Sequence, residues 1–162
     1  MPRVYISIGS NIERAANIRA GVTALRERFG DLVVSSVYES QPVGFTGDDF
    51  YNLVVGFDTA QDVHVVNEHL HNIERDHGRA RNGQRFNSRT LDLDLLVYGN
   101  AVIHERDLTL PRDEILSYAF VLCPLAEIAG DEKHPLQGMT YAELWHEFEK
   151  GPQPLWVVGF EW

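Results

Sequence analysis

A length of 162 residues suits one domain with a substantial core and is short for two. A hydrophobic content of 44% and an aromatic content of 10% are typical of a globular protein and exclude a disordered chain. The formal net charge of −10 argues against a general nucleic-acid binder, whose binding surface is usually basic. No window approaches the roughly 18 consecutive apolar residues of a membrane-spanning helix. We therefore expect neither nucleic acid nor a membrane among the partners.

Cysteine usage and the first residues bear on the compartment. The single cysteine, Cys123, lies in the apolar run FVLCPL and is expected to be buried. One cysteine permits no disulfide within the chain, as is common in reducing compartments. The opening residues, MPRVYISIGS, lack the uninterrupted apolar run of a signal peptide. We expect a cytoplasmic protein with a single domain over residues 1–162.

The first part of the chain alternates segments of strand and helix periodicity. The first helix has a possible capping box, Ser10 with Glu13, and Gly30 ends it. Asp62 is the predicted N-cap of the second helix, which ends near Gly78. The predicted strands cover residues 3–8, 32–39, 50–58 and 90–98.

The order β-α-β-β-α-β indicates an α+β protein of the ferredoxin-like class, with helices packed on one side of an antiparallel sheet. The remainder is predicted to be an appended C-terminal helical segment. It contains a helix over 118–130 with Pro124 inside it, and a helix that opens with a capping box, Thr140 and Glu143. The connections 39–49 and 78–90 are long for a compact domain, and such loops are often functional.

Two acidic residues lie inside the last predicted strand, in RTLDLDLLVYGN (residues 89–100). Side chains alternate between strand faces, so Asp92 and Asp94 share one face, roughly 7 Å apart, while Leu91, Leu93 and Leu95 share the other. Three interpretations are open. The aspartates face solvent, pair with nearby arginines, or bind a divalent cation, for which carboxylate oxygens are suitable ligands.

The loop before this strand is rich in arginine. Residues 75–89 contain five arginines, whereas the whole chain has only two lysines. A guanidinium group offers a fork of donors suited to phosphate oxygens, although a solvated loop with scattered ion pairs is the ordinary alternative. Arginines beside an aspartate pair favour phosphoryl transfer from a nucleoside triphosphate. No GxxxxGK[ST] loop is present, so side chains and metal would have to hold the phosphates.

With these residues the chain resembles the 6-hydroxymethyl-7,8-dihydropterin pyrophosphokinase family of folate biosynthesis. The resemblance spans nearly the whole chain, and its most specific part is R-x-R followed by RTLDLD. The other matching segments are YISIGSN, VYESQPVG, DFYNLVV, LTLP and AFVLCPLAEIA. The resemblance implies transfer of the pyrophosphoryl group of ATP to the pterin hydroxymethyl oxygen, with release of AMP. We expect a monomer whose partners are ATP and this pterin.

The resemblance also implies roles for particular residues. Two Mg²⁺ ions would be held by Asp92 and Asp94. Phe50 and Phe120 would sandwich the pterin ring, although the residue pattern alone favours the core for both. The implied catalytic residues are Arg79, Arg89, Asp92 and Asp94. The implied ATP-binding residues are Glu74, Arg79, Arg81, Phe86, Arg89, Leu95, Thr109 and Arg112. The implied pterin-binding residues are Ser40, Val43, Phe50, Asn52, Asp92 and Phe120.

The chain departs from the family pattern on the ATP side. Arg112 follows LTLP where a histidine is usual, Tyr118 stands in place of an arginine, and 87–88 read Asn-Ser where Gly-Pro is usual. Our hypothesis is that Arg112 supplies the lost positive charge. Two alternatives to the enzyme are a non-catalytic paralogue that binds pterin or nucleotide, and a structural module in which Asp92 and Asp94 are surface residues.

Overall fold

The computed structural model describes residues 1–44, 46–77, 91–149 and 153–162. The described strands are β1 (Arg3–Ser10), β2 (Val33–Val34), β3 (Tyr38–Ser40), β4 (Phe50–Asp58), β5 (Asp92–Tyr98), β6 (Ile103–Glu105), β7 (Leu108–Leu110) and β8 (Leu155–Val157). The described helices are α1 (Arg14–Phe29), α2 (Val63–Asp76), the 3-10 helix η1 (Asp113–Leu116), α3 (Ala119–Ala129) and α4 (Tyr141–Glu147).

One antiparallel sheet organises these elements, in the order β5-β1-β4-β3-β8, with β2 also paired to β4. The first four elements of this order reproduce the ferredoxin-like arrangement, so the predicted α+β class is confirmed. Strands β6 and β7 form a separate two-stranded sheet. The edge strand β8 was not predicted, because its short apolar run follows the predicted end of the helical segment.

Local predictions succeed where one side chain decides a helix start. The Asp62 side chain accepts a hydrogen bond from the backbone N–H of His64. Thr140 and Glu143 form the predicted capping box of α4. The capping box at Ser10 was wrong, because pairing with β4 extends β1 through Ser10. Helix α1 instead begins at Arg14, after Glu13 in a left-handed conformation with φ 42°.

Two further predictions need correction. The strand predicted over 32–39 is interrupted, with β2 and β3 pairing separately to β4. Cys123 is half-buried rather than buried, and its side chain lies beside Tyr38 of the short strand β3. No helix of the described residues is both long and apolar enough to cross a membrane.

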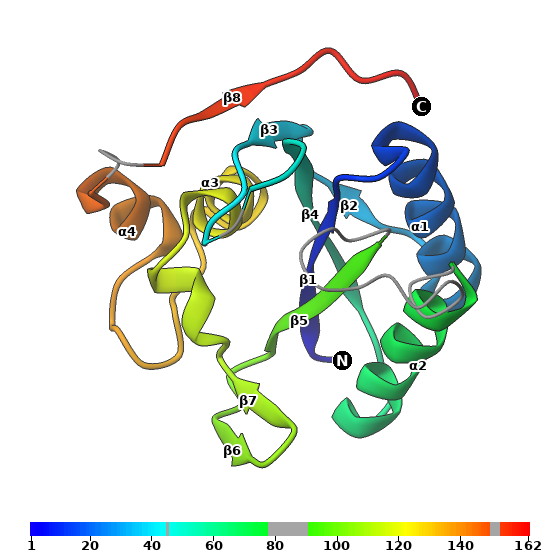
Figure 1. Ribbon diagram of the computed structural model, residues 1–162. Coiled ribbons are helices and arrows are strands. Elements are labelled where there is room, and N and C mark those ends of the chain that lie inside the picture. Colours follow the sequence, from blue (N-terminus) through cyan, green and yellow to red (C-terminus); the bar gives the residue numbers. More distant parts are fainter. Residues whose placement is uncertain (45, 78–90, 150–152) are drawn as a thin grey trace.

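The two helices of the ferredoxin-like unit lie on one face of the sheet as predicted, and the appended helical segment covers part of the other face (Figure 1). Helices α1 and α2 cover the face that carries Ile6, Leu53 and Leu95. Helix α3, with α4 beyond it, covers part of the opposite face over Tyr5, Val54 and Leu96. The apolar residues of α3 need this second face, because a helix with few polar residues is stable only when buried.

Candidate active site

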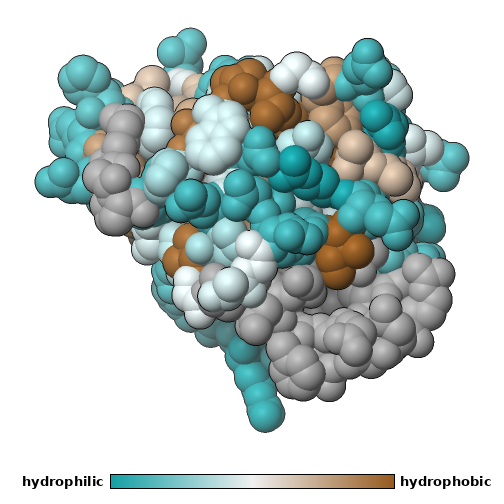
Figure 2. Space-filling view, turned by 45° about the horizontal axis from the view of Figure 1, so that its top comes forward, coloured by the Kyte–Doolittle hydropathy of each residue, from teal (hydrophilic) through white to brown (hydrophobic). Residues whose placement is uncertain are grey.

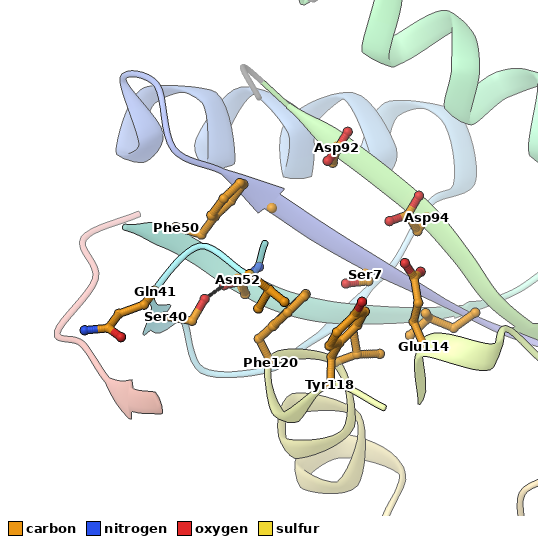
Figure 3. Close-up of a pocket in the computed structure, with 14 residues that line it drawn as sticks. Ser7, Ser40, Gln41, Phe50, Asn52, Asp92, Asp94, Glu114, Tyr118 and Phe120 are labelled. Carbon is orange, nitrogen blue, oxygen red and sulfur yellow. Dashed lines mark hydrogen bonds between the residues drawn. The ribbon is translucent and has the colours of Figure 1, made fainter. Parts of the chain in front are cut away.

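A cavity of about 210 Å³ lies on the α3 face of the sheet, where that helix no longer covers the strands (Figure 3). Its residues come from β1, β3, β4, β5, η1, the start of α3 and the segment after β3. The lining residues are Ser7, Gly9, Ser40, Gln41, Val43, Phe50, Asn52, Asp92, Asp94, Leu96, Glu114, Tyr118, Phe120 and Val121.

Strand register builds the floor of the cavity. Gly9 of β1 lies between Asn52 of β4 and Asp92 of β5, and Ser7 pairs with Asp94. A Cβ atom on Gly9 would lie 3.1 Å from the Asn52 Nδ2 atom, which is tighter than ordinary van der Waals contact. Small residues on β1 therefore keep the floor open between the amide of Asn52 and the two carboxylates.

Aromatic side chains stand on either side of this floor. Phe50 and Phe120 lie on opposite sides of the cavity, with Asn52 between them (Figure 3). Tyr118 stacks on Phe120 with ring centroids 5.1 Å apart and an interplanar angle of 13°. A flat ring inserted between Phe50 and Phe120 would meet aromatic faces, an arrangement that favours heteroaromatic ligands.

The orientation of the buried Asn52 amide is fixed by its neighbour on β3. The Ser40 hydroxyl donates a hydrogen bond to Asn52 Oδ1 over 2.6 Å, and both residues are 4% exposed. This contact engages the carbonyl end of the amide and leaves Nδ2 on the side of Gly9. The amide N–H₂ group can thus donate to a ring acceptor lying on the floor.

The two aspartates line the side of the cavity formed by β5, and both are half-buried. Leu91, Leu93 and Leu95 lie in the core on the opposite face, so the predicted alternation is confirmed. Asp92 and Asp94 thus present carboxylate oxygens, which are hard ligands suited to Mg²⁺.

A buried carboxylate from α2 supports the strand between the two aspartates. The backbone N–H of Leu93 donates to Glu74 Oε2 over 2.8 Å, and Glu74 is 4% exposed. Glu74, a predicted ATP-binding residue, therefore contacts the β5 backbone and does not line the cavity. The contact holds β5 against α2 at the position between Asp92 and Asp94.

Arg112 brings a positive charge to the aspartates. Its guanidinium lies 3.4 Å from Asp94 Oδ1, and its Nε–H donates to the Glu114 carboxylate. Burial by itself lowers the pKa of Arg112, but the negative charge of Asp94 and the hydrogen bond to Glu114 outweigh burial, and the pKa is raised. The backbone N–H of Arg112 donates to the Leu96 carbonyl over 2.9 Å, which attaches this residue to β5.

The other predicted ATP-binding residues are placed differently. Thr109 is half-buried on β7, opposite His104, and does not line the cavity. The Leu95 side chain is 2% exposed in the core on the face opposite the aspartates. Only the backbone of Leu95 could therefore meet a nucleotide without disrupting the core. Arg79, Arg81, Phe86 and Arg89 lie outside the described residues.

All six predicted pterin-binding residues line the cavity, but the sequence prediction missed several of their neighbours. Gln41, Glu114 and Tyr118 come from irregular or short segments, whose positions local patterns do not predict. The sequence did contain a pattern that could have identified Ser7 and Gly9 as cavity residues. On β1 the hydrophobic residues lie on one face, whereas the other face changes from Tyr5 to these two small residues.

An α+β fold whose antiparallel sheet carries an aromatic, amide-lined cavity beside paired carboxylates belongs to the class of proteins suited to bind a flat heteroaromatic molecule. The comparisons are more specific. The family model of 7,8-dihydro-6-hydroxymethylpterin-pyrophosphokinase matches residues 5–130. The chain belongs to this family.

Curated relatives agree with the family match. The chain is 36% identical over 135 residues to the 2-amino-4-hydroxy-6-hydroxymethyldihydropteridine pyrophosphokinase of Haemophilus influenzae, covering 81% of this chain and 84% of the relative. It is 39% identical over 135 residues to the enzyme of the same name from Methylorubrum extorquens, covering 81% and 85%. The Bacillus subtilis enzyme of that name is 37% identical over 128 residues, covering 76% of each chain.

A solved structure shows the same fold. The Plasmodium falciparum HPPK-DHPS protein superimposes with a TM-score of 0.68 over 91% of this chain at 15% identity. This chain spans 43% of the length of that protein. At such low identity the likeness concerns the fold alone.

Proposed function

We propose that the cavity holds the pterin ring between Phe50 and Phe120 and directs its hydroxymethyl group toward ATP phosphates beside Asp92 and Asp94. The observation that carries this proposal is the convergence of aromatic rings, the fixed Asn52 amide and the two carboxylates in one cavity. The residues that meet there come from five stretches of the chain, 7–9, 40–43, 50–52, 92–96 and 114–121. A purely structural module would not need this arrangement. An open cavity beside two carboxylates adds no packing to the fold, so it does not contribute to stability.

Family membership establishes the reaction. The chain is a transferase that moves the pyrophosphoryl group of ATP to hydroxymethyldihydropterin in folate biosynthesis. Pterin recognition then belongs to Asn52, whose amide donors suit a ring acceptor, and to the two phenylalanines, which exclude water from the ring faces. Ser40 keeps the amide in this orientation.

The carboxylates fit the requirements of Mg²⁺, and we propose two ions held by Asp92 and Asp94. Both residues project from one face of β5 into the cavity. In the described residues no cluster of three or more His, Cys, Asp or Glu side chains suited to a metal is found. A donor set of two carboxylates suits Mg²⁺, which completes its shell with water and phosphate oxygens. Bound there, the ions would neutralise phosphate charge and favour attack by the hydroxymethyl oxygen.

On the nucleotide side we propose that Arg112 contacts the ATP phosphates or the charge that develops on them. Its guanidinium already lies beside Asp94, and Glu114 fixes its direction. Arg79, Arg81, Phe86 and Arg89, outside the described residues, stay proposed ATP-binding residues. Their proposed role follows from the family resemblance. Glu74, Leu95 and Thr109 also stay proposed ATP-binding residues on that ground, although none of them lines the cavity.

We further propose that the protein acts as a monomer with a single domain over residues 1–162, and in the cytoplasm. The face in Figure 2 is mostly hydrophilic, with apolar side chains in separate patches, which supports the monomer. The lone Cys123 forms no disulfide within the chain, as is common in reducing compartments.

The deciding experiment mixes the purified protein with ATP, Mg²⁺ and 6-hydroxymethyl-7,8-dihydropterin and separates AMP from ADP. We expect AMP in amounts equal to the pterin diphosphate, and none when the pterin is omitted. ADP would show transfer of a single phosphoryl group and contradict the proposal. Tight pterin binding without turnover would identify a non-catalytic pterin-binding paralogue.

A further inference from the structure

Residues 153–162, which we call the edge segment, lie outside the stretch 5–130 matched by the family model. They nevertheless contact both walls of the cavity. One wall is the end of β3 with the segment that follows it, carrying Ser40 and Val43. The other, which we call the aromatic wall, is the start of α3 with Tyr118 and Phe120.

Gln153 binds the backbone on both sides of Tyr118. The backbone N–H of Ala119 donates to Gln153 Oε1 over 2.8 Å, and Gln153 Nε2 donates to the Ser117 carbonyl over 3.0 Å. Tyr118 is the N-cap residue of α3 and makes no side-chain capping hydrogen bond. The Gln153 amide thus satisfies a backbone donor at the start of the helix, a task that a local cap usually performs.

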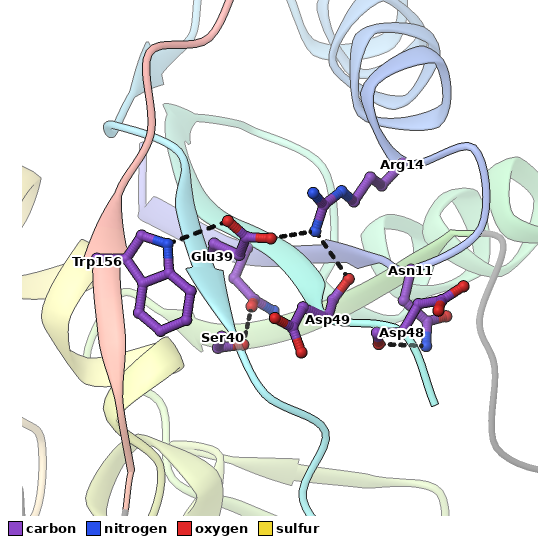
Figure 4. Close-up of polar contacts among 8 residues, drawn as sticks. Asn11, Arg14, Glu39, Ser40, Asp48, Asp49 and Trp156 are labelled. Carbon is purple, nitrogen blue, oxygen red and sulfur yellow. Dashed lines mark hydrogen bonds and ion pairs between the residues drawn. The ribbon is translucent and has the colours of Figure 1, made fainter. Parts of the chain in front are cut away.

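Strand β8 holds the other wall. It extends the sheet by pairing with β3, with Ser40 opposite Leu155 and Glu39 opposite Trp156. The Trp156 indole N–H donates to Glu39 Oε1 over 3.0 Å, and Arg14 of α1 donates to Glu39 Oε2 over 2.6 Å (Figure 4). These contacts fix β3 at the position of Ser40, whose hydroxyl orients Asn52.

The rest of the edge segment is anchored on the opposite face of the sheet, against the core under α1 and α2. The Phe160 ring packs edge-on against Tyr51, with centroids 5.8 Å apart, and the Arg19 Nε–H donates to the Glu161 carbonyl over 2.7 Å. A second cavity of about 50 Å³ lies where the segment meets both walls, lined among others by Val43, Phe120 and Gln153. The segment therefore spans the space behind the two walls.

We propose that the edge segment sets the separation of the two cavity walls and thereby the affinity for the pterin, with Gln153 as the positioning residue of the aromatic wall. The inference rests on the proposed function, because it takes the cavity as the pterin site. Gln153 does not line that cavity, so it acts through Tyr118 and Phe120. The nucleotide side, around Arg112 and Asp94, has no such contact with Gln153 among the described residues.

The test compares Gln153→Ala and Gln153→Met with the native protein. Methionine has a similar length but can form neither amide hydrogen bond, so it separates hydrogen bonding from packing. We expect both variants to raise the pterin Kd, measured by calorimetric titration, and the pterin KM by about tenfold, the loss expected for such contacts. The ATP KM and kcat at saturating pterin should stay within about twofold of the native values. Gln61→Ala, which changes an exposed glutamine just before α2, is the matched control and should have no effect.

Asn52→Ala, measured in parallel, separates the two proposals. If Asn52→Ala weakens pterin binding and neither Gln153 variant does, the positioning role is wrong and the pterin site stands. If Asn52→Ala leaves pterin binding unchanged, the assignment of the cavity fails, and the positioning role fails with it. An equal rise of the pterin and ATP KM values, together with a lower Tm, would reduce Gln153 to a general structural role and also overturn the inference.

Discussion

The two faces of the sheet are built from the same strands but serve different purposes. On the α1–α2 face, Ile6, Leu53 and Leu95 are at most 2% exposed and belong to one continuous core. On the α3 face the core residues Tyr5 and Val54 are followed, two residues closer to the cavity on each antiparallel strand, by Ser7 and Asn52. A helix therefore covers only part of that face, and the uncovered part forms the cavity.

This difference shows how one strand can contribute to stability and chemistry at once. On β5, Leu93 and Leu95 face the core under α1 and α2, whereas Asp92 and Asp94 face the cavity. Adjacent positions should therefore respond oppositely to mutation. Substitutions on the cavity face should lower the turnover rate without loss of stability. Substitutions on the face toward α1 and α2 should lower stability without loss of catalytic activity.

The largest expected effect is on turnover in Asp94→Ala. Removing this carboxylate takes away a proposed metal ligand and a partner of Arg112, so we expect AMP production to fall by about 10²–10³-fold, as for loss of a preorganised charge-stabilising group. Tm should change little, because the residue is half-buried and outside both cores. Asp107→Ala, in an exposed turn, is the control. Native turnover in Asp94→Ala would refute the catalytic role of this face.

Its neighbour Leu95→Ala should affect stability instead. Truncation of a fully buried leucine leaves a cavity in the core, and we expect the free energy of unfolding to fall by about 2–5 kcal/mol in urea titrations. The folded variant should retain its ATP KM at low temperature. Val65→Ala, at a residue 42% exposed on α2, is the control and should cost little. A higher ATP KM with unchanged stability would instead assign Leu95 to the nucleotide site.

Arg112→Ala tests whether this residue replaces the positive charge that the family pattern places nearby. We expect the ATP KM to rise by about tenfold, because a charge-assisted contact to phosphate is lost. The pterin Kd should be unchanged, since Arg112 does not line the cavity. Arg106→Ala, in an exposed turn, controls for a general loss of charge. Unchanged ATP KM and kcat would show the replacement hypothesis to be wrong.

The smallest expected effect is a pH dependence of stability from His134. Burial lowers the pKa of this residue, which is 3% exposed, and its Nδ1 accepts a hydrogen bond from the Leu136 N–H over 3.0 Å. The unfolded chain therefore binds a proton at a higher pH than the folded protein does. Stability from this group is full above the unfolded pKa, about 6.5, and is lost as the pH falls toward the lower folded pKa.

Unfolding free energies measured at about pH 7.5 and pH 5.5 would reveal this loss. His134→Asn, which retains an acceptor for the Leu136 N–H, should show a smaller loss between the two pH values than the native protein. His104→Asn, at an exposed position, should behave like the native protein. An identical pH dependence in His134→Asn and the native protein would contradict the assignment.

The local sequence was enough to predict the ferredoxin-like order, the start of α2 at Asp62 and the start of α4 at Thr140, because each depends on local periodicity or a local hydrogen bond. It also determined the alternation on β5, since strand geometry assigns each face without knowledge of the rest of the fold. The pterin-side residues were named through a family resemblance and not through their pattern, which for Phe50 and Phe120 favours the core.

The packing of the whole chain determines which segments distant in sequence lie around the cavity. Strand register places Gly9 between Asn52 and Asp92, and no local pattern encodes that pairing. The capping box expected at Ser10 failed for the same reason, because pairing with β4 outweighed the local helix signal. The amide of Gln153 caps a helix that begins 34 residues earlier in the chain. Such contacts depend on how the whole chain packs, so they emerge only when the sheet and its two helical layers are assembled.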